Sequence, residues 1–137
     1  MIGLLASGGT VLLLDQWSKS VVRLFGPNHS ISCGHFLRIR RVANLNRIYR
    51  SVKIRRMMAL VWLVALASAV ALHDSGLWFQ GPAALTGLGL AFGGAAGNLV
   101  DIWRHQFVVD FIDLGWWPVF NFADVGIVGG LLLAFWR

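Results

Sequence analysis

The chain has 137 residues, of which 57% are hydrophobic, and its mean hydropathy is +0.67. This composition excludes an ordinary soluble domain and indicates one integral membrane domain. The formal net charge is +6, and the single cysteine, Cys33, excludes a disulfide bond within the chain.

Four apolar segments predict four transmembrane helices. They span about residues 2–22, 57–72, 82–100 and 120–136. Each has roughly 16–21 residues, close to the ~20 that a helix needs to cross the hydrocarbon core of a bilayer. A secretory signal peptide is the alternative for the first segment. No small-residue cleavage site follows that segment, however, and the polar run DQWSKS breaks its end.

The first connection, residues 23–56, is expected to form an extramembrane domain rich in β-structure. Leu37 and Ile39 alternate with Arg38 and Arg40, a pattern that favours short strands. The connection is also strongly basic, since ten of the twelve Lys and Arg residues lie between positions 19 and 56.

The other two connections differ in character. The run HDSGLWFQG between the second and third segments predicts a tight hairpin of two helices. Residues 101–119 are rich in Trp and Phe, so they are expected to lie along the membrane interface as a loop or helix.

Glycines recur at four-residue spacing in the last two segments. Gly89, Gly93 and Gly97 share one face of the third segment, and Gly126 and Gly130 share one face of the fourth. Small residues at this spacing let another helix backbone approach closely, so we expect these faces to be packing surfaces.

The acidic residues suggest chemistry. All six are aspartates, and Asp101, Asp110, Asp113 and Asp124 surround the third connection, after the third helix and one turn into the fourth. A carboxylate in a bilayer is costly and therefore a functional candidate. Two that converge can share a proton, so that one activates a water and the other donates to a peptide carbonyl. The alternative is a structural role, with Asp101 as a helix cap and Asp124 in an ion pair.

No competing catalytic or metal motif is visible. The sequence shows no assignable Ser-His-Asp pattern, no HExxH and no Cys/His cluster with metal-ligand spacing. The four histidines are scattered, and we interpret them as interfacial or loop residues.

Four short runs resemble the lipoprotein signal peptidase (signal peptidase II) family of bacterial membrane aspartyl peptidases. They are Asp15, Gln16 and Lys19 in the first segment, GGAAGNLVD (93–101), VVDF (108–111) and PVFNFAD (118–124). The family pattern is D-Q-x-x-K, then G-N-x-x-D-R, V-x-D-F and F-N-x-A-D. The resemblance covers the whole chain in order.

The resemblance implies a role for each matching residue. Asp110 and Asp124 fall on the catalytic pair, whereas Asp113 matches no essential position and is expected to be solvated. The positions implied to bind substrate or support the site are Asp15, Lys19, Asn44, Asn98, Asp101, Arg104 and Asn121.

The resemblance also implies a function. The expected protein is a multi-pass enzyme of the bacterial inner membrane, with four transmembrane helices and an active site near the outer face. It would remove the signal peptide from prolipoproteins that carry a diacylglyceryl-cysteine, with Trp116 and Trp117 at headgroup depth. Membrane lipids are its other expected partners. We expect a monomer without metal or organic cofactor and without nucleic acid.

Two departures keep other functions open. Ile102 replaces the Arg of G-N-x-x-D-R, with Arg104 two residues later, and NLNRIYR (44–50) stands where the family carries N-x-G-A-A-F. The basic first connection would also lie in the cytoplasm by the positive-inside rule, opposite to the family orientation. One alternative is a protein of the same fold that binds lipid or a membrane partner through this connection. The other is a purely structural membrane protein.

Overall fold

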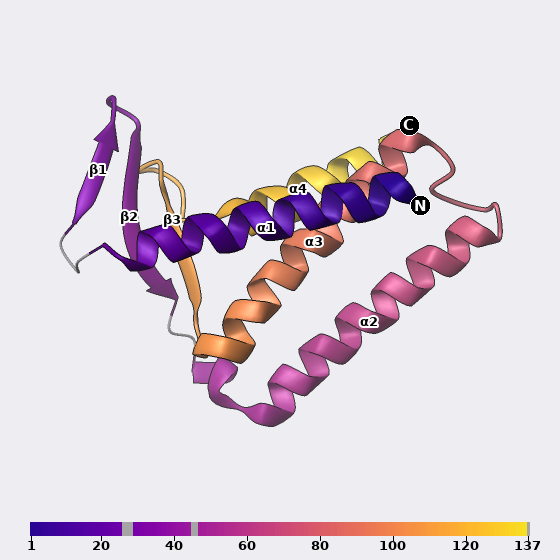
Figure 1. The fold of residues 1–137 in the computed structure, drawn as a ribbon, viewed down its shortest axis with the longest axis horizontal. Coiled ribbons are helices and arrows are strands. Elements are labelled where there is room, and N and C mark those ends of the chain that lie inside the picture. The colour runs from indigo at the N-terminus through magenta and orange to yellow at the C-terminus, as the bar shows by residue number, and fades with distance from the viewer. Residues whose placement is uncertain (26–28, 45–46, 137) are drawn as a thin grey trace.

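The computed structural model describes residues 1–25, 29–44 and 47–136, and these form a helical bundle with a small sheet at one end (Figure 1). The helices are α1 (Ile2–Arg23), α2 (Val52–Asp74), α3 (Pro82–His105) and α4 (Phe122–Ala134), with a 3-10 turn at Arg47–Arg50. The strands are β1 (Ser30–Cys33), β2 (Leu37–Asn44) and β3 (Val108–Asp113). Both termini lie at the end opposite the sheet.

The helix bounds differ from the predicted ones where local capping extends or stops a helix. Helix α2 begins at Val52 instead of about 57, because the Ser51 hydroxyl accepts a hydrogen bond from the Ile54 N–H. Helix α3 continues past residue 100 to His105 and ends at Gln106, whose φ of 63° is left-handed. Asp101 therefore lies inside the helix, so the prediction that it follows the helix was wrong.

The connection before α4 also differs from the prediction. The sequence predicted an interfacial loop or helix, but its central part is strand β3. The described residues form an antiparallel sheet of order β1-β2-β3, in which β2 pairs with both neighbours. The sheet thus joins the first connection to the third, and the fold is not purely α-helical.

The predicted alternation in the first connection is confirmed. In β2, Leu37 and Ile39 are half-buried whereas Arg38 and Arg40 are exposed. Strand β3 is buried along most of its length and contributes Val109 and Phe111 to a small core beneath α1. The sheet is therefore anchored to the bundle through β3.

Close packing of α3 against its neighbours depends on glycine, as the spacing predicted. A Cβ on Gly130 of α4 would lie 2.5 Å from the Ala91 nitrogen and 2.5 Å from the Gly87 oxygen, both on α3. A Cβ on Gly97 would lie 2.6 Å from the Asp15 Oδ2 atom of α1. The glycines let three helices meet closely enough for polar side chains to share one interior.

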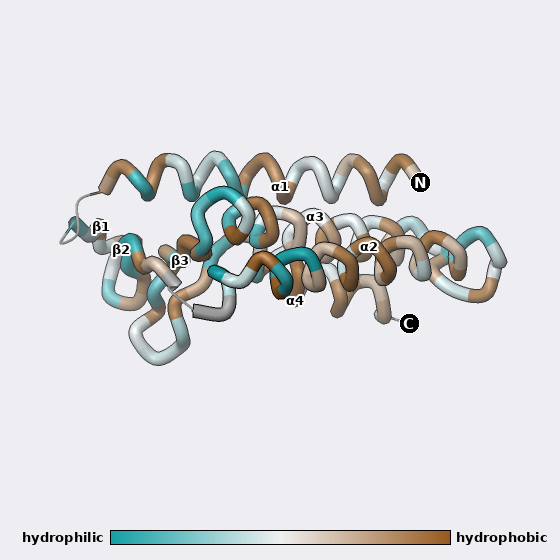
Figure 2. Tube along the Cα trace, turned by 90° about the horizontal axis from the view of Figure 1, so that it is seen from below, coloured by the Kyte–Doolittle hydropathy of each residue, from teal (hydrophilic) through white to brown (hydrophobic). Residues whose placement is uncertain are grey.

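Helix α2 stands apart from this packed core. It diverges from α1 and α4 in Figure 1, and among its described residues only Ala69 is buried. Figure 2 shows hydrophobic residues along the helices and hydrophilic ones gathered near the strands. By length and composition, α2 and α3 could each cross a membrane, and α4 is a shorter apolar helix.

Candidate active site

Two asparagines link the two predicted catalytic aspartates. Asp110 lies on β3 and is 7% exposed, and its Oδ1 atom accepts a hydrogen bond of 2.8 Å from Asn121 Nδ2. Asp124 Oδ1 accepts one of 3.0 Å from Asn98 Nδ2. The amides meet each other, because Asn121 Nδ2 lies 3.3 Å from Asn98 Oδ1. Side chains from α3, β3 and α4 thus form one connected group.

The start of α4 fixes the position of Asp124. Asn121 and Asp124 form a capping box: the Asp124 N–H donates to Asn121 Oδ1 at 3.0 Å, and the Asn121 N–H donates to Asp124 Oδ2 at 3.1 Å. The carboxylate also lies at the positive end of the helix dipole. Asn121 therefore holds the Asp124 carboxylate with its backbone N–H and the Asp110 carboxylate with its side-chain amide.

A buried charge network lies behind the asparagines. The Lys19 ammonium lies 2.7 Å from Asp15 Oδ2 and 2.9 Å from Asp101 Oδ2, and all three side chains are fully buried. Lys19 also donates to Asn98 Oδ1 at 2.9 Å. An opposite charge offsets much of the cost of burying each ion, so the network connects α1 firmly to α3 and to the amide that contacts Asp124.

Asp15 extends this network to the fourth helix. Its Oδ1 atom accepts a hydrogen bond of 2.9 Å from the backbone N–H of Ala123, in the first turn of α4. Gln16 donates to the Gly97 carbonyl at 3.1 Å and lies 3.4 Å from Asp101 Oδ1. The D-Q-x-x-K run of α1 thus positions the ends of α3 and α4 that carry Asn98 and Asp124.

Arg23 is a member of the site that sequence reasoning missed. Its Nη2 atom lies 2.6 Å from Asp101 Oδ1, so two cations balance the charges of Asp15 and Asp101. The predicted Arg104 is instead exposed on the last turn of α3. Arg23 follows Lys19 by four residues and so lies on the same helix face, which is the signal that could have identified it.

The other predicted positions are Asn44, Trp116 and Trp117. The backbone of Asn44 ends β2 and pairs with Val108, whereas its side chain falls outside the described part of the structure. Trp116 and Trp117 are 76% and 56% exposed and stack edge to face. Their exposure fits the predicted position at headgroup depth.

Asp113 is not solvated, contrary to the prediction. It is 8% exposed, its Oδ2 atom pairs with Arg40 Nε at 2.6 Å, and its Oδ1 atom accepts a hydrogen bond of 2.8 Å from the Gly115 N–H. The Gly115 N–H first, and then Arg40, hold the pKa of the Asp113 carboxyl below its usual value. Asp113 is thus a structural residue of the sheet.

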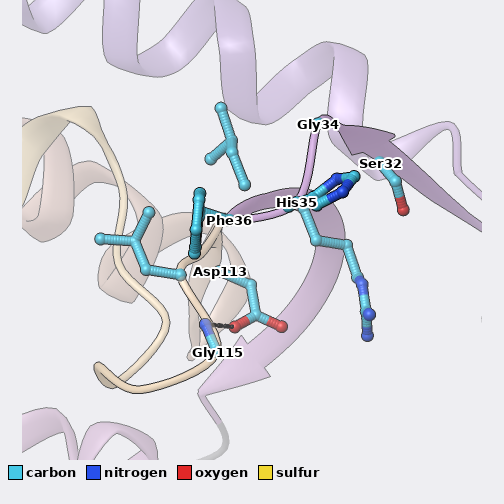
Figure 3. A pocket seen from close by; sticks show the side chains of 9 residues that line it. Ser32, Gly34, His35, Phe36, Asp113 and Gly115 are labelled. Atoms are coloured by element: carbon cyan, nitrogen blue, oxygen red, sulfur yellow. Dashed lines mark hydrogen bonds between the residues drawn. The ribbon is translucent and has the colours of Figure 1, made fainter.

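The surroundings of Asp113 form a small cavity of about 110 Å³ at the β1–β2 turn (Figure 3). Ser32 of β1 lines it together with His35 and Phe36 of the turn, and Gly115 lines it after β3. Its lining includes neither Asp110 nor Asp124, so it is separate from the linked aspartates.

A much larger apolar groove leads to the linked aspartates. It lies between α2 and the packed pair α3 and α4, with a volume of about 730 Å³. Asn98 and Val108 line it at the site, and Met57, Ala95 and Ile127 are among its apolar residues. The groove can take an extended apolar chain next to the carboxylates. Among the described residues, no cluster of three His, Cys, Asp or Glu side chains could hold a metal ion.

Comparison with known proteins adds a consistent set of relatives. The family described as Signal peptidase (SPase) II matches residues 9–137. The lipoprotein signal peptidase of Moorella thermoacetica is 36% identical over 129 residues, which cover 93% of this chain and 86% of that protein. That of Mycolicibacterium smegmatis is 37% identical over 141 residues, which cover 95% and 58%.

The fold has relatives of known structure. A solved bacterial membrane enzyme matches 95% of this chain and 88% of its own length, with a TM-score of 0.77 and 24% sequence identity. A second matches 95% and 83%, with a TM-score of 0.76 and 23% identity. At these identities the likeness concerns the fold alone.

Proposed function

This chain belongs to the signal peptidase II family and is a lipoprotein signal peptidase, an aspartyl endopeptidase of the bacterial membrane, and from this premise we propose that Asp110 and Asp124 are its catalytic pair. The observation that carries the proposal is the bridge of Asn98 and Asn121, which ties the two carboxylates into one group beside the apolar groove.

The proposed reaction is direct hydrolysis of a peptide bond. One carboxylate takes a proton from a water as the water oxygen attacks the carbonyl carbon, while the protonated partner donates to the carbonyl oxygen. The tetrahedral intermediate then breaks its C–N bond, and the amine leaves with a proton from a carboxyl group. Asn98 and Asn121 hold both carboxylates in place, so the pair is organised before substrate binds.

The groove supports a substrate with a long apolar part. We propose that the signal peptide of a prolipoprotein lies against α3 and α4 in the 730 Å³ groove, with a diacylglyceryl-cysteine at the edge near Asn98. Because α2 makes few buried contacts, it can adjust to the volume of acyl chains. The apolar Ile102, in place of the family arginine, lines this groove.

The proposed orientation places the sheet and the active site at the outer face of the membrane, with all four helices spanning it. Both termini lie at the opposite end of the bundle and would face the cytoplasm. The basic first connection opposes this by the positive-inside rule. Part of that charge is neutralised, however, since Arg23 pairs with Asp101 and Arg40 pairs with Asp113.

Cleavage of a diacylglyceryl-modified prolipoprotein by the purified protein in detergent tests the proposed pair. We expect Asp110→Asn and Asp124→Asn each to lower the rate by at least about 10³-fold, because each removes a group that must both donate and accept a proton. Asp74→Asn is the matched control, since Asp74 is exposed at the far end of α2. Near-normal cleavage by either asparagine variant would exclude that residue from the chemistry.

A further inference from the structure

An arginine that makes no ion pair with any described residue lies where α2 begins. The guanidinium carbon of Arg55 lies 5.5 Å from the centre of the Trp103 ring on α3. Its Nε atom is buried and has no hydrogen-bond partner among the described residues. A buried N–H without an acceptor costs free energy, and the half-buried guanidinium as a whole would gain from a hydrogen-bond acceptor beside it.

The charges around Arg55 indicate the sign of that ligand. Lys53, Arg55 and Arg56 lie at the start of α2, and no acidic residue is present in its first turn. Cations are unfavourable at a helix N-terminus, where the dipole is positive. The ion pairs between described residues engage Lys19, Arg23 and Arg40, and none engages these three. An anion would relieve the repulsion.

An apolar groove begins directly below this cationic group. It has a volume of about 320 Å³ and lies between α2 and α3, where Ala59 and Leu63 face Ala96, Val100 and Trp103. Ala59 and Leu63 follow Arg55 at intervals of four residues, so all three share one face of α2. The site therefore has a cationic head and an apolar tail.

We propose that the cationic group at Arg55 and the apolar groove below it bind one anionic phospholipid. The phosphodiester group accepts hydrogen bonds from Arg55, with Arg56 beside it, and an acyl chain lies in the groove below. A soluble anion would not need the groove, and a zwitterionic lipid, whose phosphodiester offers the same acceptor oxygens, would leave the net positive charge of Arg55 and Arg56 uncompensated. A membrane enzyme with two membrane-crossing helices around the groove has phospholipid as its nearest solvent.

The proposed lipid site is separate from the substrate groove. Trp62 of α2 lines both grooves, and its Nε1 atom donates to the Phe92 carbonyl of α3 at 3.1 Å. This indole forms the wall between them, so a lipid can occupy one groove while the other stays open. Lipid binding can be measured without reference to peptidase activity.

The test is native mass spectrometry of the purified full chain, with phosphatidylglycerol and phosphatidylcholine of the same acyl chains. We expect phosphatidylglycerol to bind more tightly, and Arg55→Gln to weaken it by about five-fold or more. Lys53→Gln is the matched control. It removes an equal charge from the same turn, but from nearly the opposite side of the helix, and should change binding little. Equal binding of both lipids, or an unchanged affinity in Arg55→Gln, would overturn the proposal.

A second variant separates a lipid from a free phosphate and guards against misfolding. Ala59→Phe fills the apolar groove and leaves every arginine in place, so it should weaken phosphatidylglycerol binding. Glycerol phosphate, which has the anion but no acyl chain, should not displace the lipid. Full displacement by glycerol phosphate, or normal lipid binding in Ala59→Phe, would reduce the site to an anion site and refute the lipid proposal. Thermal unfolding in lipid-free detergent confirms that each variant is folded.

Discussion

At the scale of single residues, Lys19 organises the interior near the active site. Its ammonium group contacts two carboxylates and one amide, and that amide contacts Asp124. A cation in this position serves two purposes. Together with Arg23 it balances the charges of Asp15 and Asp101, and it fixes the oxygen of Asn98 so that the nitrogen of the same amide faces Asp124.

Replacing Lys19 is therefore expected to be more harmful than replacing Arg23. Lys19→Met leaves two buried carboxylates without their shared cation and should lower the free energy of unfolding by about 3–5 kcal/mol. Arg23→Gln should cost less, because Asp101 keeps Lys19 and Arg23 is partly exposed. Thermal unfolding in detergent measures both. An unfolding temperature of Lys19→Met that equals or exceeds that of Arg23→Gln would contradict this ranking.

The Asp113–Arg40 ion pair predicts a pH dependence of the sheet. Because the pKa of Asp113 is lowered on folding, its contribution to stability is present above the unfolded value of about 3.8 and is lost as the pH falls further. Wild type should thus unfold at a higher temperature than Asp113→Asn at pH 6, and the difference should shrink below pH 4. A gap that stays constant between pH 6 and pH 3 would contradict this.

Most site residues could be predicted from the sequence because short motifs carry them. Asp110, Asn98, Asn121 and Asp124 come together as the motifs suggested, although their catalytic roles stay predictions until they are tested. Arg23 was missed because it lies outside every motif and because its partner, Asp101, was placed after the helix. Its role depends on α3 continuing to His105, which only the structure shows.

At the scale of elements, contacts between helix backbones depend on residues that lack a side chain. Gly87 on α3 and Gly130 on α4 bring the two backbones together, so that the start of α4 can reach Asn98. Four-residue glycine spacing predicted the face of Gly130, but not Gly87, because the predicted face of α3 (Gly89, Gly93 and Gly97) packs against α1 instead. Strand β3 was not predicted because it is buried on both faces and therefore lacks the alternation that identified β2.

Two neighbouring glycines of α4 provide a matched test of this packing. Gly130→Ala places a methyl group 2.5 Å from two backbone atoms of α3, and should lower the free energy of unfolding by about 1–3 kcal/mol. Gly129→Ala meets no atom within 4 Å, so its effect should stay within about 1 kcal/mol of zero. Thermal unfolding of both variants in one detergent decides the matter. Equal changes in the unfolding temperature would show that the close contact at Gly130 does not determine the stability of the α3–α4 packing.

At the scale of the whole molecule, α1, α3 and α4 pack together and position the site residues, whereas α2 stands apart and lines both grooves. Four apolar segments and a strand-forming first connection could be predicted, since hydropathy and alternation report on each segment alone. The divergence of α2 and the two grooves beside it could not be predicted from the sequence, because both depend on the distance between helices. Between Met57 and Leu72 the sequence of α2 is apolar on nearly all sides and favours no single packing face.

The buried ion pair of Asp15 and Lys19 on α1 has a consequence for the insertion of the chain into the membrane during synthesis. A ribosome delivers α1 to the membrane first, when Asp15 and Lys19 have only each other as partners. Asp101 and Asn98 arrive with α3, and the Ala123 N–H arrives with α4. A nascent chain interrupted after α2 would therefore expose an incompletely paired charge to lipid. Stable insertion of α1 is therefore expected to depend on the two helices that are made last, since they supply the missing partners.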